Sequence, residues 1–514
     1  MSVQTELCGL MLDSARCQEN RAYYRNFIRF AADRGVNILH WHFTDDQGCT
    51  LQFDSVPALA SPHAYSKTEM RELIAFAREN GITIIPELAS LGHTRYITRL
   101  EQFNDLDEIE HVFTGICPVS PRTREILAQL VAETAEVFDA PWIHAGLDEA
   151  NIGNHPLTKK ALATRSRGEI VADHINFMHE QISRHGRKMM MWGDSLLHDR
   201  QITDHISRDI IICNWQYGAQ VDGASTQYFL DKGFPVVLCP ALISHEQPVF
   251  PGDQLAISNL RSLLQHRSRT GKGKILGTIE TIWQPERYMH DSLWIGIDLA
   301  IAMIKEGPDV SIEDCTRNFA KDFYGVTPSE KWVAACREIY QRSPLRRQWL
   351  PEFKMELEKL PAQEELNEST RAWQRIADVL NAEEPHVQKN QQAYRTFCLM
   401  VELIAHAYRK ADLLTGPPIN SDIAREILDD ERQLLQQVDA VWDHERFADD
   451  PRKRSAIREY FSDDCLLATL RSMLMRTESL LNEKMHKTEA KKLEVSIHVP
   501  KRGPGITLGK QPAR

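Results

Sequence analysis

The feature that most constrains this chain is a repeated alternation of short apolar runs with amphipathic stretches. Eight runs are typical of strands: Cys8–Asp13, Val36–Phe43, Ile82–Leu88, Trp142–Gly146, Lys188–Trp192, Asp209–Trp215, Pro235–Cys239 and Lys274–Trp283. Helical periodicity follows several of them, at Asn20–Asp33, Lys67–Glu79, Pro121–Phe138, Lys159–Arg184 and Ser292–Ile304. Eight strand–helix units predict an α/β fold, a (β/α)8 TIM barrel. A doubly wound sheet is the rival, but it would place a glycine-rich turn after the first strand, and Asp13-Ser14-Ala15-Arg16 stands there instead.

The pattern changes after about Gly307, where strand signals fade and helical periodicity dominates. Leu466, Leu470 and Leu474, for example, recur at the spacing of one helix face. From about Lys484 the chain turns basic and loses periodicity. We therefore predict a barrel over residues 1–308, a helical appendage over 309–483 and a disordered tail over 484–514.

Composition excludes several classes of function. The net charge of -11 argues against nucleic acid as the main partner. No apolar run is long enough to span a bilayer, and the first residues do not resemble a signal peptide. The ten cysteines form no Cys-x-x-Cys pair, which weakens zinc and redox interpretations. We expect a cytoplasmic protein with reduced thiols that uses no cofactor or metal.

Two adjacent carboxylates, Asp148 and Glu149, follow the fourth predicted strand. In a β/α barrel the carboxyl ends of the strands carry the chemistry, and paired carboxylates there suit acid/base work on a sugar bond. The alternative is a helix N-terminus, where acidic side chains favour the macrodipole. Neighbouring residues on a strand point to opposite faces, so both can serve one site only if the chain kinks at the strand tip.

Other strand tips also end in polar or aromatic residues, and together they would ring one mouth of the barrel. Those expected to contact substrate are Asp45, His144, Trp192, Trp215, Tyr217, Trp283 and Glu286. Tryptophan faces stack on the apolar faces of sugar rings, so three tryptophans at separate tips favour a carbohydrate ligand.

The ordered motifs resemble glycoside hydrolase family 20, the β-N-acetylhexosaminidases. The matching segments are Gly9-Leu10-Met11-Leu12-Asp13-Ser14-Ala15-Arg16, Leu39-His40-Trp41-His42-Phe43-Thr44-Asp45-Asp46-Gln47-Gly48, Ile85-Pro86-Glu87, Leu91-Gly92-His93 and His144-Ala145-Gly146-Leu147-Asp148-Glu149. The resemblance covers the barrel and not the appendage.

The resemblance implies an exo-acting, retaining glycosidase in which the substrate's own 2-acetamido oxygen attacks the anomeric carbon. Glu149 would be the general acid, and Asp148 would hold the acetamido group. His93 and Asp46 would form the relay behind the acid. A glutamate beside a second carboxylate in a partly dry pocket should have a raised pKa, so we expect Glu149 to be protonated near neutrality. The implied partner is a carbohydrate with a terminal N-acetylhexosamine.

Several positions depart from the family pattern. Cys8 stands where the family has an arginine that holds the sugar, and Cys239-Pro240-Ala241-Leu242 lacks the family's tyrosine, for which Tyr217 is a candidate replacement. Pro285 occupies the family's acidic position, with Glu286 one residue on, and Leu147 and Cys49 replace a glycine and a tryptophan. We read the chain as a divergent member with an altered sugar-binding shell.

Two other functions remain open. A metal-dependent hydrolase would use His40 and His42 together with His93, His144 and Asp148. A sugar-binding pseudoenzyme would keep the carboxylate pair without turnover. The sequence gives neither the gluco or galacto preference, the aglycone, nor the oligomeric state.

Overall fold

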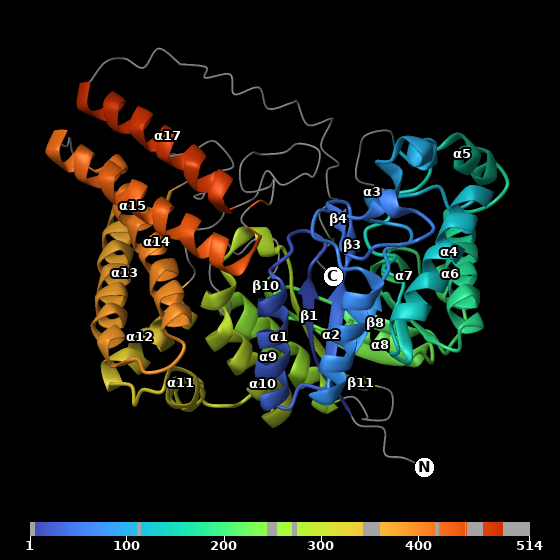
Figure 1. Cartoon of the computed structure of the whole chain (residues 1–514), viewed down its shortest axis with the longest axis horizontal. Helices are drawn as coiled ribbons and strands as arrows, with labels where there is room; N and C mark the ends of the chain where they lie inside the picture. Colours follow the sequence, from blue (N-terminus) through green and yellow to red (C-terminus); the bar gives the residue numbers. More distant parts are fainter. Residues whose placement is uncertain are drawn as a thin grey trace.

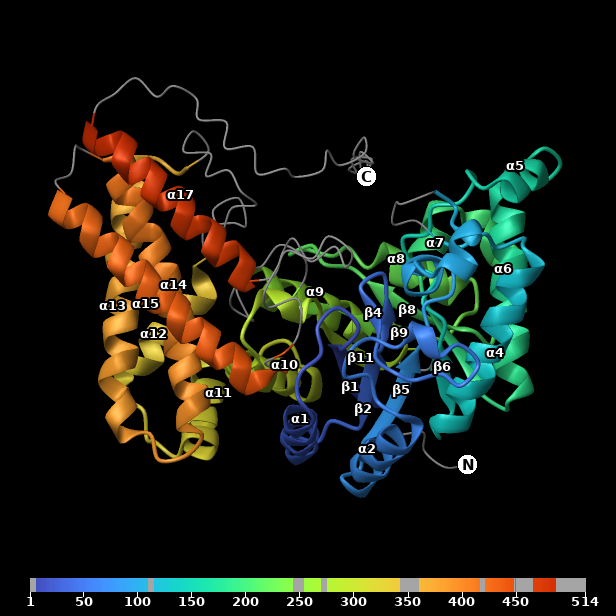
Figure 2. The same cartoon turned by 45° about the horizontal axis from the view of Figure 1, so that its top comes forward.

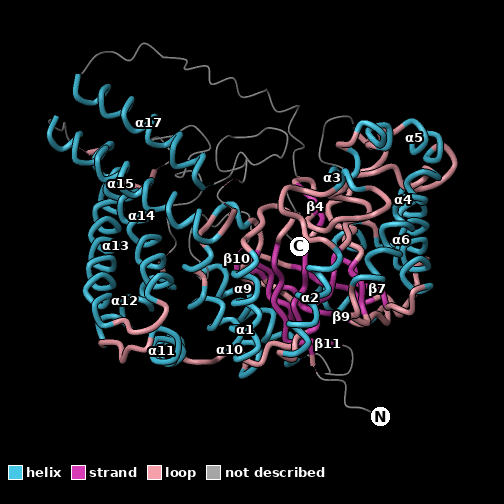
Figure 3. The backbone as a smooth tube through the Cα atoms, in the orientation of Figure 1, coloured by secondary structure: helices cyan, strands magenta, loops and turns pink. Residues whose placement is uncertain are grey.

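The computed structural model describes residues 6–109, 115–243, 254–269, 275–342, 360–416, 421–447, 449 and 466–486. Its centre is a closed barrel of parallel strands, in the order β1-β2-β5-β6-β7-β8-β9-β11, with β1 also paired to β11 (Figures 1 and 3). These strands are β1 (Leu7–Asp13), β2 (Ile38–His42), β5 (Thr83–Glu87), β6 (Trp142–His144), β7 (Lys188–Trp192), β8 (Ile211–Trp215), β9 (Val236–Cys239) and β11 (Ile275–Ile282). The predicted TIM barrel and its eight strands are confirmed.

Three short strands lie outside this ring. The antiparallel pair β3 (Thr44–Asp45) and β4 (Gly48–Cys49) follows β2, and β10 (Ala241–Ile243) pairs with β11 at its carboxyl end. The tight β3–β4 turn brings Asp45 and Asp46 back over the barrel end of β2, because Thr44 Oγ1 bonds the backbone of both Glu87 and Ala89.

Alternation along the strands builds two hydrophobic layers. The smaller cluster fills the barrel, with Met11, Ile38, Ile85, Met190 and Val237 among its buried members. The other faces of the same strands join the large cluster beneath the helices. Each buried Leu, Ile or Met side chain stabilises the fold by roughly 1.5–3 kcal/mol. Because both faces of each barrel strand are buried, the strands appear in the sequence as near-continuous apolar runs.

The barrel helices are α1 (Arg21–Asp33), α2 (Lys67–Glu79), α3 (Arg95–Thr98), α4 (Pro121–Val137), α5 (Pro156–Leu162), α6 (Arg167–Arg184), α7 (Asp194–His198), α8 (Ala224–Asp231), α9 (Gln254–Arg269) and α10 (Trp294–Glu306). The prediction of one helix over Lys159–Arg184 is wrong. Ser166 caps a new helix there, because its side chain accepts from the Glu169 backbone and Glu169 bonds the Ser166 backbone in return. Helices α8 and α9 were not predicted.

The helical part comprises α11 (Ile312–Phe319), α12 (Glu330–Gln341), α13 (Gln363–Glu383), α14 (Gln391–Thr415), α15 (Ser421–Glu445) and α17 (Leu466–His486). These helices stand to one side of the barrel, beyond α9, α10 and α1 (Figure 2). The predicted helical character is present, and most of the predicted tail lies outside the described residues. Among the described residues, no helix is both long and apolar enough to cross a membrane.

Candidate active site

The segment after β6 departs sharply from strand geometry. Gly146, Leu147 and Glu149 all have positive φ, at 66°, 76° and 48°. This is the predicted kink, and it lets Asp148 and Glu149 serve one site. The two side chains differ in depth, since Asp148 is 14% exposed and Glu149 is 59% exposed.

Leu147 carries backbone strain at this tip. A left-handed conformation is uncommon for a residue with a branched bulky side chain and costs about 1–3 kcal/mol. The Leu147 side chain is fully buried in the large core cluster, which holds the conformation in place. The leucine therefore keeps the kink at a position where a glycine would adopt it without strain.

His93 joins the two carboxylates to a second acidic pair. Its Nε2 lies 3.3 Å from Glu149 Oε2 and 3.4 Å from Asp148 Oδ2. Its Nδ1 lies 3.2 Å from Asp46 Oδ2 and 3.6 Å from Asp45 Oδ2. The structure thus brings the four predicted catalytic residues together, with the two ring nitrogens of His93 facing Asp46 and Glu149. His93 itself has a φ of +53°, a second strained residue at the site.

The pKa values of His93 and Asp148 are both raised, for different reasons. Burial lowers the pKa of His93, but Asp148 and Asp45 beside it raise that pKa well above its ordinary value. Burial raises the pKa of Asp148 to about 8, against the lowering effect of the His93 charge. We expected a dry pocket around Glu149, and this is wrong for the exposed Glu149 side chain. The burial falls on Asp148 instead.

Asp194 binds the backbone of Glu149. It begins α7, directly after β7, and its Oδ2 accepts the Glu149 backbone N–H at 2.9 Å. Its Oδ1 accepts the indole N–H of Trp215 at 3.2 Å, so a residue of β8 holds the carboxylate that holds Glu149. Asp194 is 8% exposed and was not among the predicted site residues, although its place at a strand tip was visible in the sequence.

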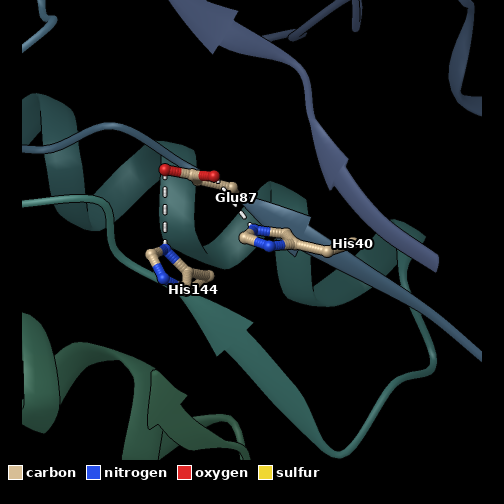
Figure 4. A group of neighbouring side chains, drawn as sticks. All are labelled: His40, Glu87 and His144. Atoms are coloured by element: carbon tan, nitrogen blue, oxygen red, sulfur yellow. Dashed lines mark ion pairs between the residues drawn. The ribbon is translucent and has the colours of Figure 1, made fainter. Parts of the chain in front are cut away.

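Below the mouth, Glu87 is the centre of a buried cluster (Figure 4). Its Oε2 lies 2.9 Å from His40 Nε2 and 2.9 Å from His42 Nδ1. Its Oε1 accepts the Trp192 indole N–H at 2.7 Å and lies 3.6 Å from His144 Nδ1. Four strands, β2, β5, β6 and β7, are therefore tied to one carboxylate.

Two histidines of the cluster, His42 and His144, differ in protonation. Burial lowers the pKa of His42, but Glu87 and Asp13 raise it to about 10. Burial lowers the pKa of His144 to about 3, so this histidine is neutral. Trp192 and His144 were predicted to contact substrate, yet they are 1% and 0% exposed and serve this cluster under the floor of the mouth.

The predicted five-residue metal set does not converge. Among the described residues, metal-type ligand atoms gather in two separate groups, one of His40, Glu87 and His144 and another of Asp45, Asp46 and His93. In the first group the Trp192 N–H, which cannot bind a metal, already occupies Glu87 Oε1. The donor set fits a hydrogen-bonded cluster better than a metal site.

A second cluster, around Arg16, lines another part of the mouth and adjoins the group around His93 at Asp45. Arg16 Nη1 lies 2.7 Å from Asp13 Oδ2, and its Nη2 lies 2.9 Å from Asp45 Oδ2. The guanidinium lies 5.2 Å from the ring centre of Trp283, whose indole N–H donates to Tyr217 Oη at 2.7 Å. Arg16 was not predicted as a site residue, although it closes the first motif of the sequence.

Glu286 lies on the same side. It is 5% exposed, and its Oε2 has no hydrogen-bond partner among the described residues. Burial raises the pKa of Glu286 to about 7, and Asp13 and Arg16 are among the charges acting on it. A buried carboxyl oxygen without a partner next to a mouth is available to a polar ligand.

The departures from the family pattern are unevenly placed. Cys8 lies at the amino end of β1, where its side chain packs on the outer cluster near Lys305, away from the mouth. Tyr217 is at the mouth, and Asp148 is among the charges that, after burial, raise the pKa of Tyr217 well above its ordinary value. The cysteine at position 8 therefore does not alter the lining of the mouth, and Tyr217 stands near Asp148.

Comparison with known proteins agrees with this geometry. Residues 6–254 match the sequence profile of the glycosyl hydrolase family 20 catalytic domain. The chain carries a family 20 catalytic domain. The matched range ends before β11, so Trp283 and Glu286 lie outside it.

Family 20 relatives are distant. A β-hexosaminidase of Vibrio furnissii is 27% identical over 274 residues, which covers 46% of this chain and 43% of that protein. The exo β-N-acetylglucosaminidase of Vibrio harveyi, solved with N-acetylglucosamine, aligns with a TM-score of 0.50 at 21% identity over 66% of this chain and 59% of that one. The chitobiase of Flavobacterium johnsoniae aligns with a TM-score of 0.52 at 18% identity over 91% of this chain and 77% of that one. The solved structures establish the fold, and the chain spans less than half the length of the Vibrio furnissii relative.

Proposed function

We propose that this protein is an exo-acting, retaining β-N-acetylhexosaminidase that uses substrate-assisted catalysis with an altered sugar-binding shell. The observation that carries the proposal is the contact of His93 Nε2 with both Asp148 and Glu149, while its Nδ1 faces Asp46. The solved complex of the Vibrio harveyi relative with N-acetylglucosamine supports this choice of sugar.

The different depths of the two carboxylates support the roles that we propose for them. Glu149 is exposed at the mouth, where the aglycone leaves, and it gives its proton to the leaving oxygen. Asp148 lies deeper beside the His93 cation, where it accepts the N–H of the 2-acetamido group. The acetamido oxygen attacks the anomeric carbon as the bond to the aglycone breaks, and the ionised Asp148 stabilises the resulting oxazolinium. Water then attacks the same carbon as the bond to the acetamido oxygen breaks, and it gives its proton to Glu149, so the 2-acetamido group is restored and the configuration is retained.

The sugar itself would lie against the Arg16 cluster. Trp283 and Trp215 are partly exposed and can stack on the sugar ring, whereas the buried Trp192 cannot. Glu286 offers its unpartnered oxygen to a sugar hydroxyl, and Tyr217 takes the place of the missing family tyrosine. The partner implied is a carbohydrate ending in N-acetylhexosamine.

We also propose a reducing compartment such as the cytoplasm. Nine cysteines in the described part of the chain are free thiols, at positions 8, 17, 49, 117, 213, 239, 315, 336 and 398. Free thiols in this number suit a compartment that keeps them reduced.

Hydrolysis of aryl β-glycosides, with and without the 2-acetamido group, tests the proposal. Wild type is compared with Glu149→Gln, Asp148→Asn and, as a control, the exposed Glu72→Gln on α2. We expect cleavage confined to 2-acetamido sugars, inhibition by a thiazoline mimic of the intermediate, and turnover lost in the two site variants only. Cleavage of sugars without the acetamido group would refute substrate assistance. Binding of N-acetylhexosamine without any cleavage would instead identify a sugar-binding pseudoenzyme.

A further inference from the structure

The last residues of α15, in the helical part, contact a loop of the barrel. Glu445 Oε2 accepts the backbone N–H of His290 at 2.8 Å, and its Oε1 accepts that of Asp291 at 2.8 Å. These two residues belong to the segment between β11 and α10, which also carries Glu286. A single carboxylate thus binds two consecutive backbone donors of that segment.

Arg446 binds the other half of the same loop. Its Nη2 donates to the backbone oxygens of Pro285, at 2.5 Å, and Tyr288, at 2.7 Å, which flank Glu286 and Arg287. Its Nη1 lies 2.9 Å from Glu445 Oε2, and its guanidinium packs over the Trp442 ring at 3.8 Å. The Glu445–Arg446 pair therefore holds four backbone groups of the loop, two donors and two acceptors.

The residues at the end of α15 also contact the loop between β1 and α1. The Asn20 backbone N–H donates to the Glu445 backbone oxygen at 2.9 Å. The backbones of Glu19 and Arg446 form an isolated antiparallel β-bridge. Glu19 in turn pairs with His290 and accepts the Tyr24 hydroxyl at 2.6 Å. The first and last loops of the barrel mouth are thus joined through one buried network.

This network is the closely packed part of the seam between barrel and helices. Glu19, His290, Glu445 and Arg446 are each at most 2% exposed. Beside it the seam opens into a cleft of about 770 Å³, lined by residues of α1, α10 and α14 and by Glu445 itself. The barrel and the helices are therefore not packed together along their whole length, and the Glu445–Arg446 network is a buried contact next to this opening.

We propose that Glu445 and Arg446 are positioning residues for the sugar side of the mouth, and that the helical part is in this way a component of the active site. Resting on the proposed function, this inference adds that Arg446 sets the place of Glu286, and through the β1–α1 loop that of Arg16. On the acid side of the mouth, Asp148, Glu149 and His93 have supports of their own in Asp194, Asp46 and the β6 kink. This side meets the Arg16 cluster at Asp45, which lies 3.6 Å from His93 Nδ1.

The two sides of the mouth predict a split between kinetic constants. A hydrogen bond that Glu286 Oε2 accepts from a sugar hydroxyl is present in both the ground state and the transition state, so its loss raises KM and leaves kcat nearly unchanged. A hydrogen bond to a charged group contributes about 1.5–3 kcal/mol, which corresponds to roughly 10- to 100-fold in affinity. Loss of the acid, by contrast, lowers kcat.

The test compares two matched double variants of the full chain. Glu445→Gln/Arg446→Met removes the pair at the seam. Glu431→Gln/Lys410→Met removes another buried pair of the helical part, in which Lys410 Nζ and Glu431 Oε1 lie 2.8 Å apart. Among the described residues, the hydrogen bonds and ion pairs of this pair stay within the helical part. Arg446→Lys is an intermediate variant, because lysine keeps the positive charge but has a single nitrogen with which to bind the loop. KM, kcat and binding of N-acetylhexosamine by calorimetry are measured for each, with trypsin cleavage after Arg287 as a report on the loop.

We expect the seam variant to raise KM and the sugar dissociation constant about tenfold or more, with kcat within about threefold of wild type. The bond after Arg287 should become sensitive to trypsin in the seam variant. The KM of Arg446→Lys should lie between those of wild type and the seam variant, and the Glu431/Lys410 variant should have the KM of wild type. Equal KM values for the two double variants would overturn the positioning role while the hydrolase assignment stood. A wild type that neither binds nor cleaves N-acetylhexosaminides would overturn the proposed function and this inference with it.

Discussion

Gly92 offers the sharpest test of the site geometry. A Cβ added at this position would lie 1.9 Å from the backbone oxygen of Asp148 and 3.2 Å from the backbone nitrogen of Ala150. Ordinary carbon–oxygen contacts begin at roughly 3.3 Å, so Gly92→Ala requires a shift of about 1.4 Å between the two loops. Both atoms in the clash are backbone atoms, so no side-chain rotation relieves it.

The shift falls directly on the catalytic groups. His93 follows the substituted residue, and Asp148 and Glu149 lie on either side of the displaced peptide. A misplacement of 1 Å costs on the order of 100-fold in rate, equivalent to about 2.7 kcal/mol of transition-state stabilisation. We expect Gly92→Ala to lower kcat/KM by about 100-fold or more on an aryl N-acetyl-β-hexosaminide.

Gly81→Ala is the control, because its Cβ meets nothing within 4 Å and its positive φ of 77° still imposes a stability cost of about 1–2 kcal/mol. It should lower Tm while leaving kcat/KM unchanged. Wild-type kcat/KM in Gly92→Ala, with an unchanged Tm, would refute the close packing of the two loops that we describe.

Three further predictions concern buried groups. Because burial raises the pKa of Asp148 to about 8 and the ionised form accepts the acetamide N–H, the affinity for N-acetylhexosamine measured by calorimetry should rise with pH up to about 8, and an affinity that is constant from pH 5 to 8 would contradict this. Trp192→Phe removes the N–H donated to Glu87 and should lower the free energy of unfolding by about 1.5–3 kcal/mol more than Trp41→Phe, as measured by urea denaturation, because the buried indole N–H of Trp41 has no hydrogen-bond partner within the described part of the chain. Burial raises the pKa of Glu280 well above its ordinary value, so the folded chain keeps the proton that the unfolded chain loses, and stability falls by about 1.4 kcal/mol per pH unit above the unfolded pKa. Glu280→Gln should therefore be more stable than wild type at pH 7 and equal to it near pH 4, and a constant difference across that range would exclude this explanation.

The strands of the barrel were predictable from sequence because each is buried on both faces. Runs such as Ile211–Trp215 leave no polar face to confuse with a helix. The kink after β6 also followed from the sequence, since two adjacent carboxylates on a straight strand would face apart. The break between α5 and α6 was missed because the helical periodicity continues across it, although Ser166 and Glu169 form a capping pair that marks the boundary.

Roles within the site were harder to predict. Sequence placed Trp192 and His144 at strand tips, but whether a side chain there reaches the mouth or the layer below depends on barrel depth, and both lie below with Glu87. The Glu445–Arg446 contact had no local signal at all. Its partners are backbone groups near residue 288, and only the folded chain brings them together.

The pairing of β1 with β11 also shapes how this protein is made. Cys8 pairs with Thr278, so one edge of the first strand stays without its neighbour until the ribosome has delivered nearly the whole barrel. An apolar strand with an open edge is a template for pairing with another chain. Nascent copies are thus exposed to intermolecular association for most of their synthesis, and we expect the yield of folded protein to depend on chaperone supply and on slow translation through the segment that ends at Ile282.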